Sequence, residues 1–327
     1  MIRVAIIGAG SVEFTRNVVA DLCSFPELAG QVTIALHDID RERLAYSERA
    51  AASIVRRTGA GFRVEASAER RPAVAGADYV INEIQVGGYR HTRKDFEIPK
   101  KYGVRQTIGD TIGIGGIFRG LRTIPVMVGI GNDLHELAPD ALLLNYTNPM
   151  AMVPWAVYEG TPFANVVGVC HSVRDTHAFL ARTVGVPEED VAFRTAGFNH
   201  QCFVLRFRHR RTGEDLYPRL REVIEADPDG LGRRVRVEIF RRFGYFPTES
   251  SEHSSEWMIS EASSEAGSIS SSWPASRAAL VRSHSRRFSS LRRRYSSISQ
   301  RNHATCSSSW RNQGTYSLEC SLDSVGK

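Results

Sequence analysis

The chain has 327 residues, of which 42% are hydrophobic and 24% charged, proportions typical of a globular protein with one large or two ordinary domains. Its formal net charge is +6, but ten basic and only four acidic residues follow residue 257, and the remaining 32 of each sign leave residues 1–257 neutral. Because the basic surplus is confined to the C-terminal segment, the composition argues against a nucleic-acid partner for the globular part.

The N-terminus and the cysteines indicate the cellular compartment. The apolar run Val4–Ile7 has no basic region before it and ends at a glycine turn, so it predicts a first strand and not a signal peptide. No segment approaches the length needed to span a bilayer, and we expect no membrane partner. The irregularly spaced cysteines predict no disulfide framework and a reducing, cytoplasmic location; they are Cys23, Cys170, Cys202, Cys306 and Cys320.

Residues 1–170 alternate short β-branched runs with amphipathic stretches. Buried strands are predicted at Val4–Ile7, Val32–Leu36, Phe62–Val64, Tyr79–Ile84, Ala141–Asn145 and Val166–Val169. The clearest helices between them are predicted at Thr15–Ser24, Arg41–Arg57 and Ile124–Leu137. Strands separated by helices are typical of an α/β fold with a doubly wound parallel sheet, so we expect a Rossmann-like domain over residues 1–170.

Residues 171–257 have a mixed pattern and are predicted to begin a second, incomplete α/β domain. Helices are expected at Asp175–Val184, Arg219–Ala226 and Arg233–Phe243. Strands are expected at Val191–Gly197 and Cys202–His209. The second domain therefore differs from the first in having few strands and a cluster of helices.

Residues 258–327 differ again, because serine dominates and neither helical nor strand periodicity persists. From residue 251 onward, 24 of 77 residues are serine, and arginines come in runs such as Arg292–Arg294. One interpretation is a disordered Ser/Arg-rich tail. The tryptophans Trp273 and Trp310 are unusual in such tails, and they favour an alternative hypothesis, a reading-frame slip near residue 257.

The first strand ends in a glycine-rich turn that indicates dinucleotide binding. Gly8 and Gly10, followed by Ser11 and Val12, let the backbone approach a pyrophosphate at a helix N-terminus. The third glycine of the full fingerprint is absent, and an ordinary tight turn is the alternative interpretation. At the end of the second strand Asp38 can accept both ribose hydroxyls, which favours NAD over NADP. Gln85, after the fourth strand, is expected beside the cofactor.

Four polar segments fall at or near the carboxyl ends of predicted strands, where open α/β sheets bind ligands. They contain Asp110, Asn148, Cys170 and His200. Cys170 and His200 could together bind a metal through sulfur and nitrogen, although each is more often a buried structural residue. Asn148 also fits a plain turn before proline, and Asp110 a loop cap.

These segments together resemble glycoside hydrolase family 4. The resemblance runs from residue 2 to about residue 257 and rests on motifs in the family's order, including "IGAGS", "QVGGY", "GDTIGIGGIFRGLRTIP", "LNYTNPMAM", "GVCHSV", "GFNH" and "GYFPTESSEH". The Cys-His-Ser-Val form of the cysteine motif is similar to the α-galactosidase branch. The resemblance implies a Rossmann-like domain and a second domain similar to the C-terminal domain of lactate and malate dehydrogenases.

The resemblance also implies hydrolysis of α-galactosides without net oxidation. In this family NAD removes hydride from C3 of the sugar, a base takes the proton on C2, the leaving group departs from C1, and water and hydride then return. A divalent cation, Mn²⁺ by resemblance, polarises the C3 oxygen.

The family's site residues carry over onto matching positions. The resemblance implies Cys170 and His200 as metal ligands, His171 as proton donor, and Asp110 as a carboxylate that supports the base. It places Asn148 and Arg93 against the substrate. The family's base lies beyond "TESSEH", and a tyrosine that the α-galactosidase branch carries shortly after this motif is replaced here by Trp257. No base is therefore assigned, and the chain is expected to be truncated or frameshifted there.

Two alternatives remain open beside the glycosidase. A 2-hydroxy-acid dehydrogenase shares the fold and an Asn-Pro turn, but needs a His–Asp relay and no metal. A non-catalytic remnant would bind NAD only. The glycosidase reading implies a small-molecule α-galactoside as partner and, by resemblance, a homo-oligomer.

Overall fold

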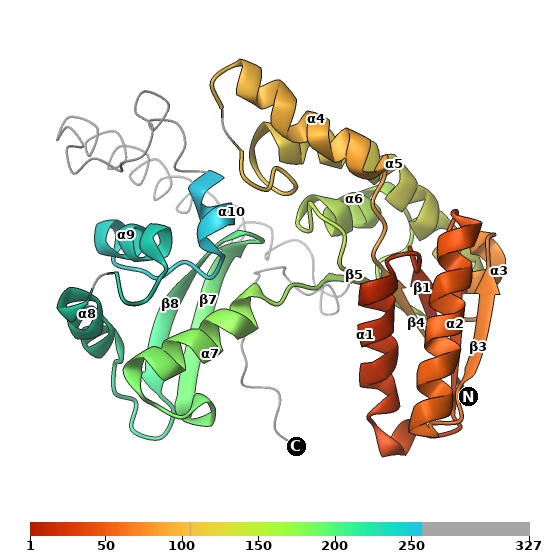
Figure 1. Ribbon diagram of the computed structural model, residues 1–327, viewed down its shortest axis with the longest axis horizontal. Helices are drawn as coiled ribbons and strands as arrows, with labels where there is room; N and C mark the ends of the chain where they lie inside the picture. The colour runs from red at the N-terminus through yellow and green to blue at the C-terminus, as the bar shows by residue number, and fades with distance from the viewer. Residues whose placement is uncertain (105, 228, 257–327) are drawn as a thin grey trace, which may run out of the picture. The chain divides into compact units, whose positions relative to one another are not determined.

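The computed structural model describes residues 1–104, 106–227 and 229–256 (Figure 1). The predictions for residues 258–327 lie outside these residues. Within the described part, residues 2–168 contain one parallel sheet and residues 172–256 a helical layer around a two-stranded sheet.

The first sheet has six strands, all parallel, in the order β3-β2-β1-β4-β5-β6. The order reverses between β1 and β4, which is the topological switch point where such sheets bind ligands. The predicted doubly wound Rossmann-like sheet is therefore confirmed. The strands are β1 Ile2–Ile7, β2 Val32–His37, β3 Arg63–Ser67, β4 Tyr79–Asn82, β5 Leu142–Asn145 and β6 Val166–Gly168.

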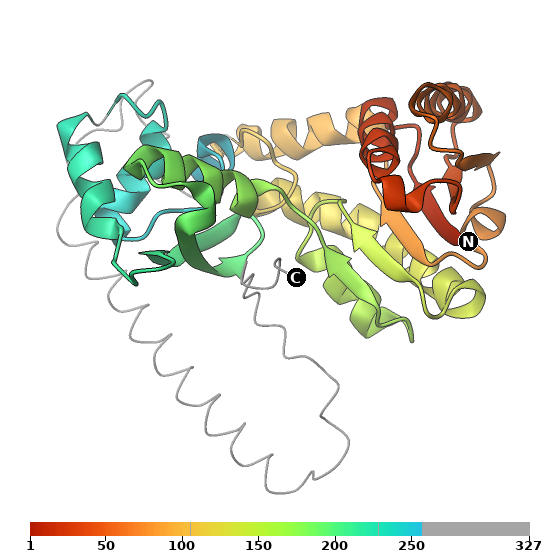
Figure 2. The ribbon, with the colours of Figure 1, turned by 90° about the horizontal axis from the view of Figure 1, so that it is seen from below.

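Successive side chains of β1 point to opposite faces of the sheet, and each face is covered by a layer of helices. Val4 and Ile6 face a core with helices α1 (Val12–Cys23) and α2 (Arg41–Thr58). Ala5 and Ile7 face the opposite core, which includes residues from α3 (Arg70–Val74), α5 (Gly113–Leu137) and α6 (Met152–Gly160). Figure 2 shows helices on both sides of this sheet. Each large aliphatic side chain fully buried between the layers contributes about 1.5–3 kcal/mol.

Helix α5 begins eleven residues earlier than the predicted helix at Ile124, because its first turns are rich in glycine. A Cβ on Gly115 would lie 2.6 Å from the carbonyl oxygen of Gly109, and a Cβ on Gly116 would lie 2.4 Å from the carbonyl carbon of Thr111. Poor helix formers occupy this turn because the loop that carries Asp110 packs directly on the helix backbone. The glycines thereby fix the position of Asp110.

Helix α5 is also long and apolar enough to cross a membrane by length and composition, so the expectation that no segment approaches this length is wrong. Its side chains Met127, Ile130 and Leu134 are buried in the core beside β1, β4 and β5. A buried core helix passes the same test, so this finding is weak evidence for a membrane span.

Residues 172–256 build a second core around an antiparallel hairpin of β7 (Val191–Phe198) and β8 (Gln201–His209). Helices α7 (Ser172–Val184), α8 (Tyr217–Ala226) and α9 (Arg234–Phe243) contribute buried residues to it. The predicted elements of this region are confirmed to within three residues at each end. The remaining elements are α4 (Gly88–Lys101), α10 (Ser251–Glu256) and the short 3₁₀ helices η1 (Pro26–Leu28) and η2 (Glu188–Asp190).

The segment after α9 runs alongside β8. The amide of Val204 donates to the carbonyl of Phe246 at 2.9 Å, and the amide of Thr248 donates to the carbonyl of Cys202 at 2.9 Å. Arg236, 6% exposed, donates to the carbonyl of Pro247 at 2.9 Å. These bonds fix the backbone immediately before Glu249.

Candidate functional site

A cavity of about 800 Å³ lies at the carboxyl ends of β1, β2 and β4, within the size range of small-molecule sites. Gly8 and Gly10 line it, and neither tolerates a side chain. Gly8 has φ +89°, and a Cβ there would lie 2.8 Å from the amide nitrogen of Ile84. A Cβ on Gly10 would lie 2.5 Å from Oδ2 of Asp38. The glycine turn is therefore required by close backbone packing at the cavity.

Asp38 lies at the far end of β2 and also lines the cavity. Its Oδ2 accepts a hydrogen bond from the amide of Gly10 at 2.7 Å, and its Oδ1 accepts from the amide of Asp40 at 2.8 Å. These bonds hold the carboxylate beside the glycine turn. The position matches that of the acidic group that binds a ribose in dinucleotide folds.

The other residues predicted to contact a cofactor divide into two groups. Ser11 and Gln85 line the cavity, and Gln85 donates to Oγ1 of Thr92 at 2.6 Å. Val12, the first residue of α1, is not among the described residues that line it.

Glu83 lines the same cavity and was missed by the sequence analysis. Thr15 donates to its Oε1 at 2.7 Å, whereas its buried Oε2 has no hydrogen-bond partner among the described residues. Burial raises the pKa of the Glu83 carboxyl to about 7, with a smaller contribution from Asp38. In the sequence Glu83 falls inside the predicted strand Tyr79–Ile84, whereas β4 ends at Asn82, so its position gave no signal of a site residue.

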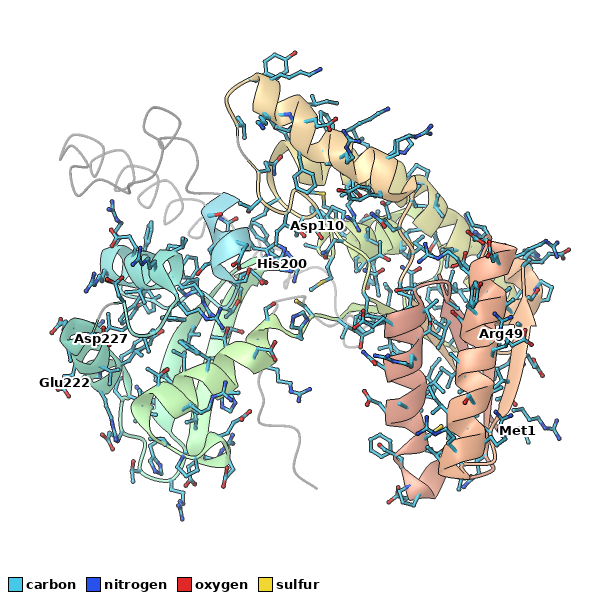
Figure 3. The ribbon with its side chains drawn as sticks, viewed as in Figure 1. Met1, Arg49, Asp110, His200, Glu222 and Asp227 are labelled. Carbon is cyan, nitrogen blue, oxygen red and sulfur yellow. The ribbon has the colours of Figure 1, made fainter. Side chains whose placement is uncertain are left out.

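Cys170 and His200 come together as predicted. Cys170 follows β6, and His200 lies in the two-residue turn between β7 and β8 (Figure 3). Sγ of Cys170 and Nε2 of His200 are 3.7 Å apart. Two ligands of one metal ion are separated by about 3–4 Å when each bond is about 2.0–2.3 Å, so the pair can share an ion.

His200 adopts a backbone conformation that side chains usually avoid. Its φ is 63°, and it is 6% exposed. A left-handed conformation costs a residue other than glycine about 1–2 kcal/mol, and such residues cluster at functional sites. The turn therefore directs the imidazole toward Cys170 at a cost in stability.

Two further residues join this cluster that the sequence analysis did not assign, Glu249 and His253. The donor atoms of Cys170, His200 and Glu249 lie within 4.8 Å of one another, and so do those of Asp110, His200 and His253. Both new residues belong to the motif "TESSEH", which served as a family marker but gave no indication of which side chains point inward.

His253 connects two carboxylates. Its Nε2 lies 3.6 Å from Oδ1 of Asp110, and its Nδ1 lies 3.3 Å from Oε1 of Glu249. Its ring also lies against that of His200, tilted by 44°, with centroids 3.9 Å apart. Burial alone would lower the pKa of His253, but the two carboxylates raise it to about 10, so the ring is cationic at neutral pH.

His200 has the opposite protonation behaviour. Burial lowers its pKa to about 4, even though the charge of Glu249 opposes this shift. Burial would raise the pKa of Glu249, but the contacts with His253 and His200 lower it to about 2. A neutral imidazole beside an ionised carboxylate is the state in which both groups bind metals.

Asp110 and Asn148 are joined directly. Nδ2 of Asn148 donates to Oδ2 of Asp110 at 2.8 Å, and Oγ1 of Thr111 donates to Oδ1 at 2.6 Å. Burial opposes ionisation of Asp110, but these bonds and the contact with His253 hold its pKa well below the usual range. Asn148 also lines the cavity, so the cavity and the cluster are neighbours.

The two remaining predicted residues are exposed. The side chain of His171 is 84% exposed and lies 3.8 Å from Asp175. The side chain of Arg93 is 60% exposed on α4 and pairs with Glu97 at 2.6 Å. His171 thus lies beside the cluster only through its place next to Cys170 in the chain. In the described part of the chain, Arg93 does not contact the cluster around Cys170 and His200.

Two family profiles match the chain. The profile of family 4 glycosyl hydrolases matches residues 3–186, and the profile of that family's C-terminal domain matches residues 195–317. The second match continues past Trp257 into the segment for which a disordered tail or a frame slip was predicted.

Similar curated proteins are α-galactosidases. The chain is 43% identical to one from Bacillus subtilis over 259 residues, which are 79% of this chain and 59% of that protein. It is 38% identical to one from Rhizobium meliloti over 260 residues, which are 78% of this chain and 52% of that protein. The chain thus spans between half and three fifths of the length of these relatives.

Similar solved structures share the fold. A candidate glucosidase of Bacillus subtilis aligns with a TM-score of 0.70 and 28% identity, covering 78% of this chain and 62% of that one. A 6-phospho-α-glucosidase from gut microorganisms in complex with NAD and Mn²⁺ aligns with a TM-score of 0.69 and 22% identity, covering 79% and 60%. Malate dehydrogenase of Picrophilus torridus aligns at 0.50 and 15% identity, covering 78% and 73%.

Proposed function

Because the chain belongs to the family 4 glycosyl hydrolases, we propose that it hydrolyses α-galactosides with NAD in the cavity and a divalent cation, Mn²⁺, at Cys170 and His200. The observation that carries the proposal is the approach of Cys170 Sγ to His200 Nε2, 3.7 Å, beside the Asp110–Asn148 pair. The α-galactosidases among its relatives support the choice of sugar.

The cavity suits NAD in shape and in charge. Gly8 and Gly10 line the cavity at the turn where a pyrophosphate binds in dinucleotide folds, and Asp38 is held where it can accept hydrogen bonds from a ribose. The carboxylate of Asp38 would repel the extra phosphate of NADP. Solved relatives that contain NAD and Mn²⁺ support the same pair of cofactors.

The donor set suits a divalent cation. Nδ1 of His200 and Oε2 of Glu249 are buried without hydrogen-bond partners among the described residues, which leaves polar groups available at the cluster. When bound, NAD supplies a hydride acceptor and the cation a Lewis acid, so that a sugar can be oxidised transiently and made acidic at the neighbouring carbon.

The chain's own residues would bind the substrate and move protons. His171 is exposed next to Cys170, and we assign it the transfer of a proton to the leaving oxygen. Asn148 is held by Asp110 with a hydrogen bond of 2.8 Å and would direct its amide toward a sugar hydroxyl. Asp110 would keep its negative charge beside the group that accepts the C2 proton, while Arg93 could reach a substrate only by leaving Glu97.

A reducing compartment is part of the proposal. Cys170 must stay reduced to bind a metal, and among the described residues Cys23 and Cys170 are free cysteines. We therefore propose a cytoplasmic location, and by family resemblance a homo-oligomer. Size-exclusion chromatography with light scattering tests the second statement.

The test is hydrolysis of p-nitrophenyl α-galactoside by the purified full chain with NAD⁺, Mn²⁺ and a thiol reductant, each omitted in turn. Release of nitrophenol that requires all three supports the glycosidase. NAD binding without turnover supports the non-catalytic alternative. Formation of NADH from a 2-hydroxy acid, with no need for metal, would support the dehydrogenase. The matched control is Cys23→Ser, which removes a thiol distant from the cluster, against Cys170→Ser.

A further inference from the structure

Glu249 is a buried carboxylate that the proposed Cys170–His200 pair leaves unused. It is 5% exposed, and its Oε1 accepts a hydrogen bond from the amide of Ser250 at 2.9 Å. Its Oε2 lies 3.3 Å from Nε2 of His200 but has no hydrogen-bond partner in the described part of the chain. Burying a carboxylate oxygen that accepts no hydrogen bond is costly, so a donor or a cation is expected to meet it.

The free oxygen of Glu249 lies at the distance of a metal ligand. It is 3.3 Å from Nε2 of His200, which is itself 3.7 Å from Sγ of Cys170, and the three donor atoms lie within 4.8 Å of one another. Ligands of one ion are separated by about 3–4 Å. Two of the three separations fall in this range and the third is at most 4.8 Å, so one cation can lie within reach of all three donor atoms.

Asp110 is a less suitable ligand, because both of its oxygens already accept hydrogen bonds, from Thr111 and Asn148. Nδ1 of His253 lies 3.3 Å from Oε1 of Glu249, and its Nε2, which has no hydrogen-bond partner among the described residues, faces Oδ1 of Asp110 at 3.6 Å. Glu249 is therefore the carboxylate of this group with an oxygen that accepts no hydrogen bond among the described residues.

The backbone before Glu249 is fixed from two sides. The amide of Thr248 donates to the carbonyl of Cys202, and the carbonyl of Thr248 accepts from Oγ1 of Thr176 at 2.6 Å. Arg236 donates to Oγ1 of Thr176 at 2.6 Å and to the carbonyl of Pro247. Support of this kind, from packed strands and buried donors, is typical of residues that must hold a ligand geometry.

We propose that Glu249 is a third protein ligand of the cation, and that His253 orients its carboxylate by binding the other oxygen. This proposal depends on the metal site proposed above and adds a third ligand to it. A carboxylate oxygen suits Mn²⁺ as a ligand. Three protein ligands still leave positions open for sugar oxygens and water.

Mn²⁺ affinity of the full chain, measured with NAD and without sugar by the electron paramagnetic resonance signal of free Mn²⁺, tests the proposal. Glu249→Gln keeps the size of the side chain, and we expect its Kd for Mn²⁺ to rise about 10–100-fold. Glu252→Gln, three residues later and exposed, is the matched control and should stay within about twofold. Equal affinities for Glu249→Gln and the parent would overturn the proposal.

Replacing Mn²⁺ with Co²⁺ distinguishes direct coordination by Glu249 from an effect of its charge at a distance. The Cys170 thiolate gives a charge-transfer band with Co²⁺, and the visible d–d bands report the number and arrangement of ligands. In Glu249→Gln the charge-transfer band should persist while the d–d bands change. Unchanged d–d bands would show that Glu249 acts through its charge alone and would overturn the proposal.

Fold integrity is checked by circular dichroism. If Glu249→Gln does not fold, Glu249→Asp replaces it, because a shortened carboxylate keeps the charge and should still alter the d–d bands. Failure of the parent chain to bind Mn²⁺ or Co²⁺ would count against the proposed function itself, whereas binding that Glu249 does not influence counts only against this inference.

Discussion

The imidazole of His200 and the carboxylate of Glu249 meet with Nε2 and Oε2 3.3 Å apart, and both side chains are at least nine-tenths buried. His200 comes from a hairpin turn and Glu249 from the segment that runs beside β8. Their approach joins a hairpin to the motif that follows it. This contact indicates that His200 belongs to an organised polar cluster and is not simply buried in the core.

His171 offers a clear separation of catalysis from stability. Because its side chain is 84% exposed, His171→Asn should leave the thermal midpoint unchanged. If His171 donates the proton to the leaving oxygen, kcat for a substrate with a poor leaving group should fall about 10²–10⁴-fold. His135→Asn, an exposed histidine on α5, is the control and should retain full activity. A matching loss in both variants, or none in either, contradicts the assignment.

Gly8 and Gly30 form a matched pair for testing the glycine turn. Both have positive φ, +89° and +71°, but a Cβ on Gly8 would lie 2.8 Å from the amide nitrogen of Ile84, whereas a Cβ on Gly30 would meet nothing within 4 Å. Alanine at either position costs about 1–2 kcal/mol for the left-handed conformation. Gly8→Ala should cost a further 1–3 kcal/mol or so by displacing backbone.

NAD titration completes this comparison. Gly8→Ala should lose at least about tenfold in NAD affinity, because the turn moves away from the pyrophosphate position. Gly30→Ala should bind NAD as the parent does. Urea unfolding and quenching of intrinsic fluorescence measure the two quantities, and equal stabilities for the two variants would argue against close packing at Gly8.

The sheet and its order could be predicted because buried parallel strands are marked by continuous apolar runs. Val32–His37 is buried at every position, and Arg41–Thr58 has both an Asp40 cap and a Gly59 stop, so their ends were located within one residue. The start of α5 was missed because its glycines serve packing on the loop of Asp110, which propensity alone does not reveal.

The candidate site could be predicted only in part. Cys170 and His200 follow strands, where position alone suggests function. Glu249 and His253 lie in a polar motif with no periodicity, and their inward orientation depends on pairing of residues 246–248 with β8. Such long-range pairing leaves no local signal in the sequence.

Arg236 is predicted to support Glu249 through the backbone. Arg236→Leu would leave the carbonyl of Pro247 and Oγ1 of Thr176 without their buried donor, which costs about 1–3 kcal/mol. The affinity for Mn²⁺ should fall as the segment loosens. Arg234→Leu, on the same helix with a side chain 78% exposed, should change neither quantity. Chemical unfolding and metal titration check both variants, and similar losses for the two arginines would refute the role.

Glu83 should give the chain's stability a dependence on pH near neutrality. Burial raises the pKa of this carboxyl to about 7 in the folded protein, from 4.5 for an unperturbed side chain. Between these values the folded state binds more protons than the unfolded state, so the free energy of unfolding falls as pH rises from about 4.5 to 7 and is level above that. The loss is about 1–3 kcal/mol.

Glu83→Gln removes this titration while keeping the side chain's shape and its contact with Thr15. Relative to the parent, the variant should therefore gain stability progressively across that pH interval and keep the full gain at pH 8. Glu48→Gln, exposed on α2, should follow the parent throughout. The measurement is urea unfolding at pH 5, 6, 7 and 8 without nucleotide. If the free energies of unfolding of Glu83→Gln and the parent differ by the same amount at all four pH values, Glu83 is already ionised at pH 5 in the folded protein. Burial would then not raise its pKa as expected.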